Sequence, residues 1–157
     1  MSGDSTLTIS EFTVENFKSI RESGSVNFGD FTVFVGKNDA GKSSLLEGLK
    51  IFLEQGKPDT NHFHKYRDVA IKMEAVFEEV PEELEDVLNE EYQSESGEFS
   101  VTRVFERRSG TTPRSDTFVN GESLAKGAIV EDDEELTKAQ SRSFIWGFMP
   151  KPIHIFA

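Results

Sequence analysis

The sequence predicts an α/β domain with a mixed sheet that carries an antiparallel subsheet. An apolar run at residues 31–35 precedes a glycine-rich motif and then a helical pattern, the order of a buried strand, a tight turn and a helix. From residue 69 onward the pattern changes to alternating strands, and Asn120-Gly121 marks a hairpin turn. A doubly wound fold would show strands and helices in regular alternation instead.

Three strands are expected before or at the motif. Residues 7–17 form a strand with an irregularity, because their apolar side chains do not keep one strict alternation. A short strand at 26–28 and the apolar strand at 31–35 follow, separated by Gly29-Asp30.

The glycine-rich motif at residues 36–43 fits the pattern G-x-x-x-x-G-K-[ST]. Such a turn points backbone N–H groups at phosphates, and the helix after it adds its positive dipole end. Lys42 would reach the β- and γ-phosphates of a nucleotide, and the Ser43 hydroxyl would bind Mg²⁺. The candidate nucleotide-binding residues are Gly36, Lys37, Asn38, Asp39, Ala40, Gly41, Lys42, Ser43 and Ser44.

Leucine and phenylalanine recur at helical spacing after the motif, and Gly56 with Pro58 is expected to end that helix. Residues 56–68 form a polar connection. The side chains from Val69 to Phe77 alternate, which predicts a strand with one buried and one solvated face.

Further elements are expected in the second half of the chain. Pro81 opens a short acidic helix, because proline and acids suit a helix N-terminus. Strands are expected near 99–107 and 116–119. The acidic run Glu131–Glu135 is interpreted as the solvated start of a helix that continues to Phe148, and residues 152–156 as a final strand.

The composition restricts the function. The chain has 157 residues, a net charge of −12 and no cysteine, which excludes disulfides, thiolate zinc sites and cysteine nucleophiles. Residues 1–57 carry 6 basic and 8 acidic side chains, whereas residues 58–157 carry 11 and 21. This acidity argues against non-specific DNA binding by this segment alone. No apolar run approaches the length of a membrane span, so a cytoplasmic protein without membrane contact is expected.

Three stretches, at residues 14–20, 31–35 and 36–44, together resemble the N-terminal part of the ABC-type ATPase heads of the structural-maintenance-of-chromosomes (SMC), RecF and overcoming-lysogenisation-defect (OLD) proteins. The first reads Val-Glu-Asn-Phe-Lys-Ser-Ile. The resemblance implies a P-loop NTPase fold and binding of ATP with Mg²⁺. It also implies that Asn38 faces the γ-phosphate and that Lys18 lies near the nucleotide, although a solvated lysine is an equal alternative for Lys18. Asp39 would be repelled by the phosphates, so it is expected to point outward or toward a partner subunit.

In such heads a second head completes the nucleotide site with a serine-glycine signature, and an acidic Walker B pair supports hydrolysis. The resemblance therefore implies a nucleotide-gated dimer in DNA repair, DNA processing or phage defence. Residues 128–133 are the nearest match to Walker B, but their acids look like a solvated helix start. Ser96-Gly97 and Ser109-Gly110 lack the flanking residues of a signature.

We therefore expect residues 1–157 to be a single ATP-binding lobe without signature or Walker B segments. Residues 7–55 would hold the first strands, the phosphate loop and its helix, and residues 69–157 a hairpin-rich region. The lobe would be part of a longer ATPase, binding ATP but hydrolysing it poorly alone. Its partner would be a second head or the missing C-terminal lobe, and DNA would be bound through the full-length protein.

Two other functions remain open. The chain could be a complete small P-loop kinase or GTPase, or a nucleotide-gated interaction module without catalysis. Smaller features have plain interpretations: His62 and His64 as a polar connector rather than a metal site, and Trp146 and Phe148 as core. The arginines Arg103, Arg107, Arg108 and Arg114 are interpreted as surface ion-pair partners rather than a DNA-facing hairpin.

Overall fold

A computed structural model describes residues 7–17, 20–22, 26–27, 40–58, 70–94, 97–106 and 114–150. The strands expected at 31–35 and 152–156 lie outside these ranges.

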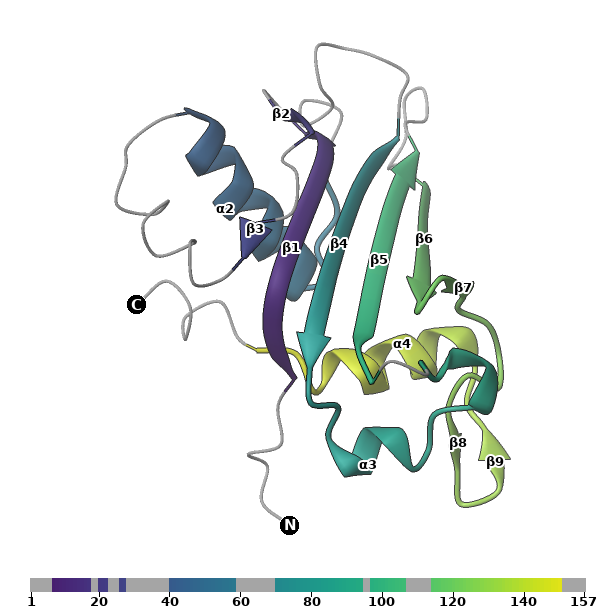
Figure 1. The fold of residues 1–157 in the computed structure, drawn as a ribbon. Coiled ribbons are helices and arrows are strands. Elements are labelled where there is room, and N and C mark those ends of the chain that lie inside the picture. The colour runs from purple at the N-terminus through teal and green to yellow at the C-terminus, as the bar shows by residue number, and fades with distance from the viewer. Residues whose placement is uncertain are drawn as a thin grey trace.

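Seven of the described strands form one sheet, and every pairing in it is antiparallel (Figure 1). The order along the sheet is β2-β1-β4-β5-β6-β7, and β3 also pairs with β1. The strands are β1 (Thr8–Phe17), β2 (Ile20–Glu22), β3 (Val26–Asn27), β4 (Ile71–Glu78), β5 (Phe99–Glu106), β6 (Arg114–Val119) and β7 (Glu122–Ser123). The antiparallel subsheet expected from the alternating patterns is confirmed.

Strand β1 has the expected irregularity. Its register with β4 shifts between Ile9 and Glu11, and the intervening Ser10 hydroxyl donates a hydrogen bond to the Val76 carbonyl at 3.0 Å. Near the other end Asn16 has a φ of 58°, and its side-chain amide donates to the Ala70 carbonyl at 3.2 Å. Asparagine tolerates this left-handed conformation better than most residues.

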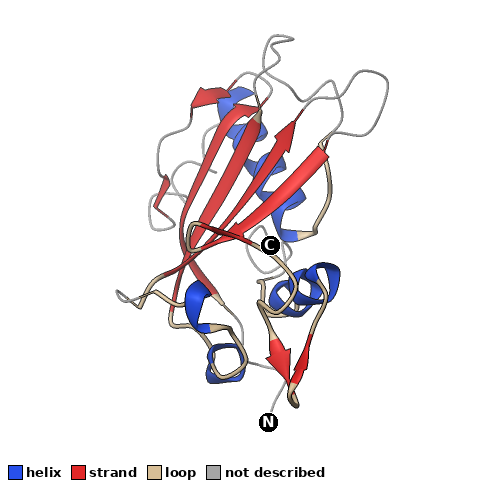
Figure 2. Cartoon of the chain, turned by 90° about the vertical axis from the view of Figure 1, so that its right-hand side faces the viewer, coloured by secondary structure: helices blue, strands red, loops and turns tan. Residues whose placement is uncertain are grey.

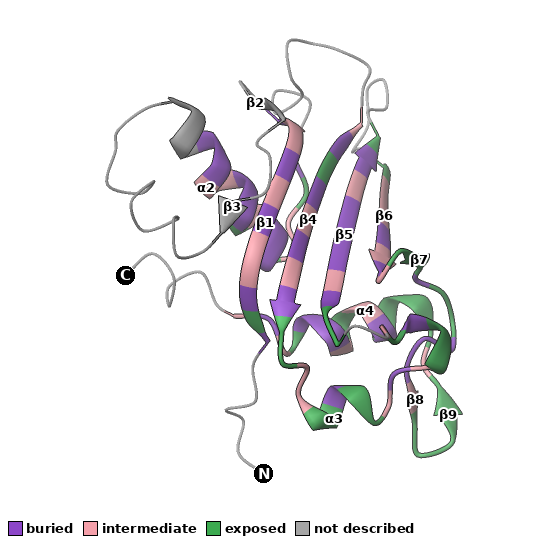
Figure 3. Ribbon diagram, viewed as in Figure 1, coloured by how far each residue is buried: buried purple, intermediate pink, exposed green. Residues whose placement is uncertain are grey.

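The alternation in β4 separates the two faces of the sheet, as Figure 3 shows. Ile71, Met73, Ala75 and Phe77 are fully buried, whereas the residues between them are half-buried or exposed. The prediction of one buried and one solvated face is confirmed.

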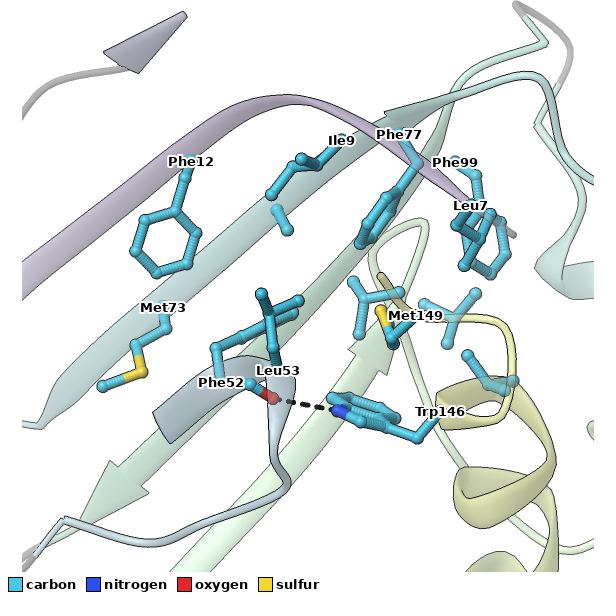
Figure 4. Close-up of a cluster of buried hydrophobic side chains, with 14 of the residues drawn as sticks. Leu7, Ile9, Phe12, Phe52, Leu53, Met73, Phe77, Phe99, Trp146 and Met149 are labelled. Carbon is cyan, nitrogen blue, oxygen red and sulfur yellow. Dashed lines mark hydrogen bonds between the residues drawn. The ribbon is translucent and has the colours of Figure 1, made fainter. Parts of the chain in front are cut away.

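Two helices pack with the buried face of this sheet. Helix α2 (Ala40–Leu53) lies against β1, and α4 (Lys138–Trp146) lies across the lower end of the sheet as drawn in Figures 1 and 2. Their side chains meet in the core, where the rings of Phe52 and Trp146 are 5.5 Å apart between centroids (Figure 4).

Helix α2 ends where the sequence suggests, but a different residue turns the chain. Gln55, with a φ of 57°, takes the left-handed position, and Gly56 does not. The amide of Gly56 donates to the Ile51 carbonyl at 2.9 Å, and that of Gln55 to the Phe52 carbonyl at 3.3 Å. These two bonds are those of a Schellman cap, which normally places glycine where Gln55 stands.

The short acidic helix is confirmed as α3 (Glu82–Glu85), with Pro81 just before its first turn and Leu84 buried. A 3₁₀ turn, η3 (Glu90–Tyr92), follows. The hairpin at Asn120-Gly121 is also confirmed: both residues have positive φ, 49° and 86°, as a type I′ turn requires.

The interpretation of residues 131–135 as a helix start is wrong. Val130–Glu131 (β8) and Glu134–Glu135 (β9) pair as a small hairpin, with Asp132 and Asp133 turning the chain at φ values of 52° and 65°. Aspartate accepts these angles, so two adjacent acids can form such a turn. Helix α4 begins later, after a capping box between Thr137 and Gln140, and ends at Trp146 rather than Phe148.

Candidate functional site

The glycine-rich motif leads directly into helix α2. The helix begins at Ala40, so the second half of the motif forms its first turn. Residues Gly36–Asp39 and the side chains of residues 40–43 lie outside the described part of the chain. Ser44 is described, and only 4% of its surface is exposed.

The first turn of α2 suits an anion. It contains no acidic residue, although acids are the side chains that normally stabilise a helix N-terminus. It holds Lys42 instead, whose charge opposes the helix dipole at this end. A phosphate group would offset both disadvantages, because it would accept from the free N–H groups and pair with the lysine.

The inner face of α2 fixes the helix against β1. Leu45, Leu49, Phe52 and Leu53 are buried in the core. Gly48 faces β1, and a Cβ atom placed there would lie in ordinary contact, 3.6 Å from the ring of Phe17.

Two side chains from other elements hold the C-terminal end of α2. The indole N–H of Trp146, on α4, donates to the Phe52 carbonyl at 2.9 Å, the dashed line in Figure 4. A guanidinium nitrogen of Arg103, on β5, donates to the Gly56 carbonyl at 2.7 Å. The Arg103 guanidinium also lies over the rings of Phe105, at 4.7 Å, and Trp146, at 5.7 Å.

The interpretation of Arg103 as a surface ion-pair partner is wrong, because only 3% of its surface is exposed. Burial lowers its pKa to about 10, and the nearby cation of Arg142 acts in the same direction. The strand alternation held the signal: Val101 and Phe105 face the core, so Arg103 must face it too. Arg114 behaves as expected, exposed and 3.8 Å from Asp116, while Arg107 and Arg108 lie outside the described residues.

The nearest match to Walker B lies far from α2. Its acids, Glu131, Asp132 and Asp133, are exposed at the β8–β9 hairpin, and the beginning of α2 lies at the other end of the molecule in both views (Figures 1 and 2). The described residues hold no group of three or more histidine, aspartate or glutamate side chains suited to a metal ion. His62, His64 and Ser109-Gly110 lie outside the described ranges.

Trp146 belongs to the core, as expected, and Phe148 packs against its edge. No helix among the described residues is long and apolar enough to span a membrane.

Comparison with known proteins identifies the family of this chain. Residues 8–146, which are most of the chain, match the family described as AAA ATPase domain. The chain belongs to this family. Membership of the AAA ATPase domain family implies a nucleotide-binding domain, in agreement with the ATPase family expected from the sequence.

Two curated relatives are uncharacterized proteins of the archaeon Methanocaldococcus jannaschii. One is 45% identical over 47 residues, which cover 30% of this chain and 14% of that protein. The other is 48% identical over 40 residues, which cover 26% of this chain and 18% of that protein. The matched segments are thus less than a fifth of either relative.

Proposed function

We propose that this chain is the ATP-binding N-terminal portion of an ATPase of the SMC, RecF and OLD group. The observation that carries the proposal is the start of α2 inside the Gly-Lys-Ser motif of an AAA ATPase domain. The first turn of this helix contains no acidic residue, and the first N–H groups of a helix have no acceptor within it, which are features that suit a phosphate.

The residues present fit ATP and Mg²⁺. Gly36 and Gly41 would let the backbone approach the phosphates, and Lys42 would pair with the β- and γ-phosphates. Ser43 would bind Mg²⁺, which neutralises phosphate charge when it is bound. Asn38 would face the γ-phosphate.

The narrower group rests on the resemblance of residues 14–20 and 36–44. On this proposal the site is completed by a second head or a C-terminal lobe, and the full-length protein acts in DNA repair, DNA processing or phage defence. The low coverage of the relatives is compatible with a longer ATPase. The nearest match to Walker B lies away from the start of α2 (Figure 1), so we expect the chain alone to bind ATP and turn it over slowly.

The decisive experiment compares Lys42→Ala with Lys50→Ala by titration with ATP and Mg²⁺. Both variants remove one positive charge from α2, but Lys50 is exposed in its last turn. Loss of a charge-assisted contact costs about 1.5–3 kcal/mol, so Lys42→Ala should bind ATP at least about tenfold more weakly than the wild type. Lys50→Ala should bind as the wild type does.

Equal affinities for the two variants would refute the phosphate site and favour a non-enzymatic interaction module in which the motif is vestigial or only structural. A second titration with GTP, together with turnover by the isolated chain, tests the remaining alternative. Rapid hydrolysis by the monomer would favour a complete small kinase or GTPase.

A further inference from the structure

Two donors from different elements converge on the same end of α2. Trp146 comes from α4 and Arg103 from β5, and each donates to a carbonyl at or just beyond the last turn of the helix. The two side chains also contact each other, because the Arg103 guanidinium lies over the Trp146 ring. Sheet, α4 and α2 are therefore joined at one point by directional bonds.

The junction of Arg103 and Trp146 with the end of α2 is unusual for a hydrophobic core. A buried arginine costs desolvation free energy, and apolar residues of similar volume are often as stabilising or more so. The Arg103 Nε–H has no hydrogen-bond partner among the described residues, and the neighbouring charge of Arg142 is repulsive. Apolar residues could fill this place, so what the arrangement adds is orientation, through two hydrogen bonds that fix the end of α2.

We propose that Arg103 and Trp146 are positioning residues for nucleotide binding, which hold α2 so that its first turn meets the phosphates. The inference rests on the proposed ATP site.

A small rotation of α2 about its C-terminal end would displace its first turn appreciably. A helix of 14 residues is about 20 Å long at 1.5 Å per residue. A rotation of about 3° at the clamped end would therefore move the first turn by about 1 Å, a displacement that can cost a site much of its function. The close-packed apolar face of α2 resists such a rotation, and the two hydrogen bonds add a directional restraint at the end of the helix.

The test measures ATP affinity, with Mg²⁺, for Arg103→Met, Arg103→Lys and Trp146→Phe, each at a temperature where circular dichroism shows it folded. Trp146→Phe keeps an aromatic ring and removes the N–H donor. Arg114→Met is the control, since it removes an exposed arginine at the start of strand β6. Arg103→Met and Trp146→Phe should each weaken ATP binding by about 2- to 30-fold, the range of couplings through packed elements. Arg103→Lys should recover part of the loss, and Arg114→Met should bind as the wild type does.

Amide hydrogen exchange without nucleotide gives a second readout. Exchange at the amides of residues 44–47, which in a helix bond to the carbonyls of the first turn of α2, should be faster in Arg103→Met and Trp146→Phe than in Arg114→Met. If both variants are less stable yet keep wild-type ATP affinity and wild-type exchange at those amides, the two residues are ordinary core and the inference is overturned.

Failure of the proposed function would look different. In that case the wild type itself would not bind ATP, and Lys42→Ala would match it. The exchange measurement would still decide whether Arg103 and Trp146 hold the first turn of α2 in place.

Discussion

Arg103 carries a positive charge inside the core, where the protein makes fewer hydrogen bonds to its guanidinium than water would. The guanidinium lies over two aromatic rings and donates to the Gly56 carbonyl, but its Nε–H is left without a partner among the described residues. Burial, with help from Arg142, lowers the pKa to about 10. The charged form therefore costs free energy in the folded state.

This cost predicts an unusual dependence of stability on pH. The folded state releases the Arg103 proton near pH 10, while the unfolded chain keeps it until the pH reaches the higher pKa of a solvated guanidinium. Between these values the unfolded state binds more protons, so the unfolding free energy of the wild type should rise relative to Arg103→Met, by about 1.4 kcal/mol per pH unit. Urea unfolding of both proteins at several pH values from neutral to strongly alkaline measures the difference. A difference that does not change with pH would mean that the guanidinium is better solvated than described.

Sequence patterns could locate this residue but not explain it. The alternation of β5 puts Arg103 on the buried face. Arginine is rarely buried, so its residue type favoured a surface position instead. Its partner, the Gly56 carbonyl, lies 47 residues away, on the turn after α2. Only the assembled fold brings the two together.

Helix α2 shows how one residue sets the distance between two elements. Gly48 faces β1, where a Cβ atom would lie 3.6 Å from the Phe17 ring and 3.7 Å from a methyl group of Val14. These are ordinary contact distances, so a methyl group fits and a larger side chain does not.

We predict that Gly48→Ala stabilises the protein by about 0.5–1 kcal/mol, because alanine is a better helix former and its methyl group finds space. Gly48→Val should destabilise it by about 1–3 kcal/mol, since its extra methyl groups would push α2 from β1. Thermal and urea unfolding measure both effects. Destabilisation by the alanine variant would place α2 closer to β1 than the structure has it.

The elements were more predictable than their ends. Strict alternation in β4 and the Asn120-Gly121 turn were enough to predict an antiparallel sheet with one buried and one solvated face. The acidic run failed because Asp132-Asp133 is compatible with both a solvated helix start and a left-handed turn. Pairing of β8 with β9, and of Leu88 with Ile129, decides for the turn, and neither contact is visible in the local sequence.

At the scale of the molecule, a group of exposed acidic side chains lies away from the start of α2. Exposed acids gather on α3, η3 and the β8–β9 hairpin, at the end of the molecule away from the start of α2 (Figures 1 and 3). They are Glu82, Glu83, Glu85, Asp86, Glu90, Glu91, Glu131, Asp132, Asp133, Glu134 and Glu135. The composition indicated an acidic second half, and the fold turns that sequence asymmetry into a spatial one. The motif at residues 36–43 could be found from sequence, but side-chain geometry around a nucleotide could not.

The charge separation predicts how two substitutions differ. Glu134 lies directly opposite Glu131 in the β8–β9 register, and like charges in that position repel. Glu122 lies opposite Val119 instead. Glu134→Lys and Glu122→Lys change the net charge equally, so any stabilisation common to both reports relief of whole-molecule repulsion. Glu134→Lys should gain about 0.2–1 kcal/mol more, from its new pair with Glu131.

Unfolding in urea at low ionic strength measures both gains, and repetition at 1 M salt, where the screening length is about 3 Å, should remove most of each. ATP affinity should stay at the wild-type value in both variants, because the acidic end lies far from the first turn of α2 (Figure 1). Equal gains for the two variants would show that Glu131 and Glu134 do not interact. A change in ATP affinity would mean that the acidic end and the nucleotide site are coupled, which the separation seen in the fold argues against.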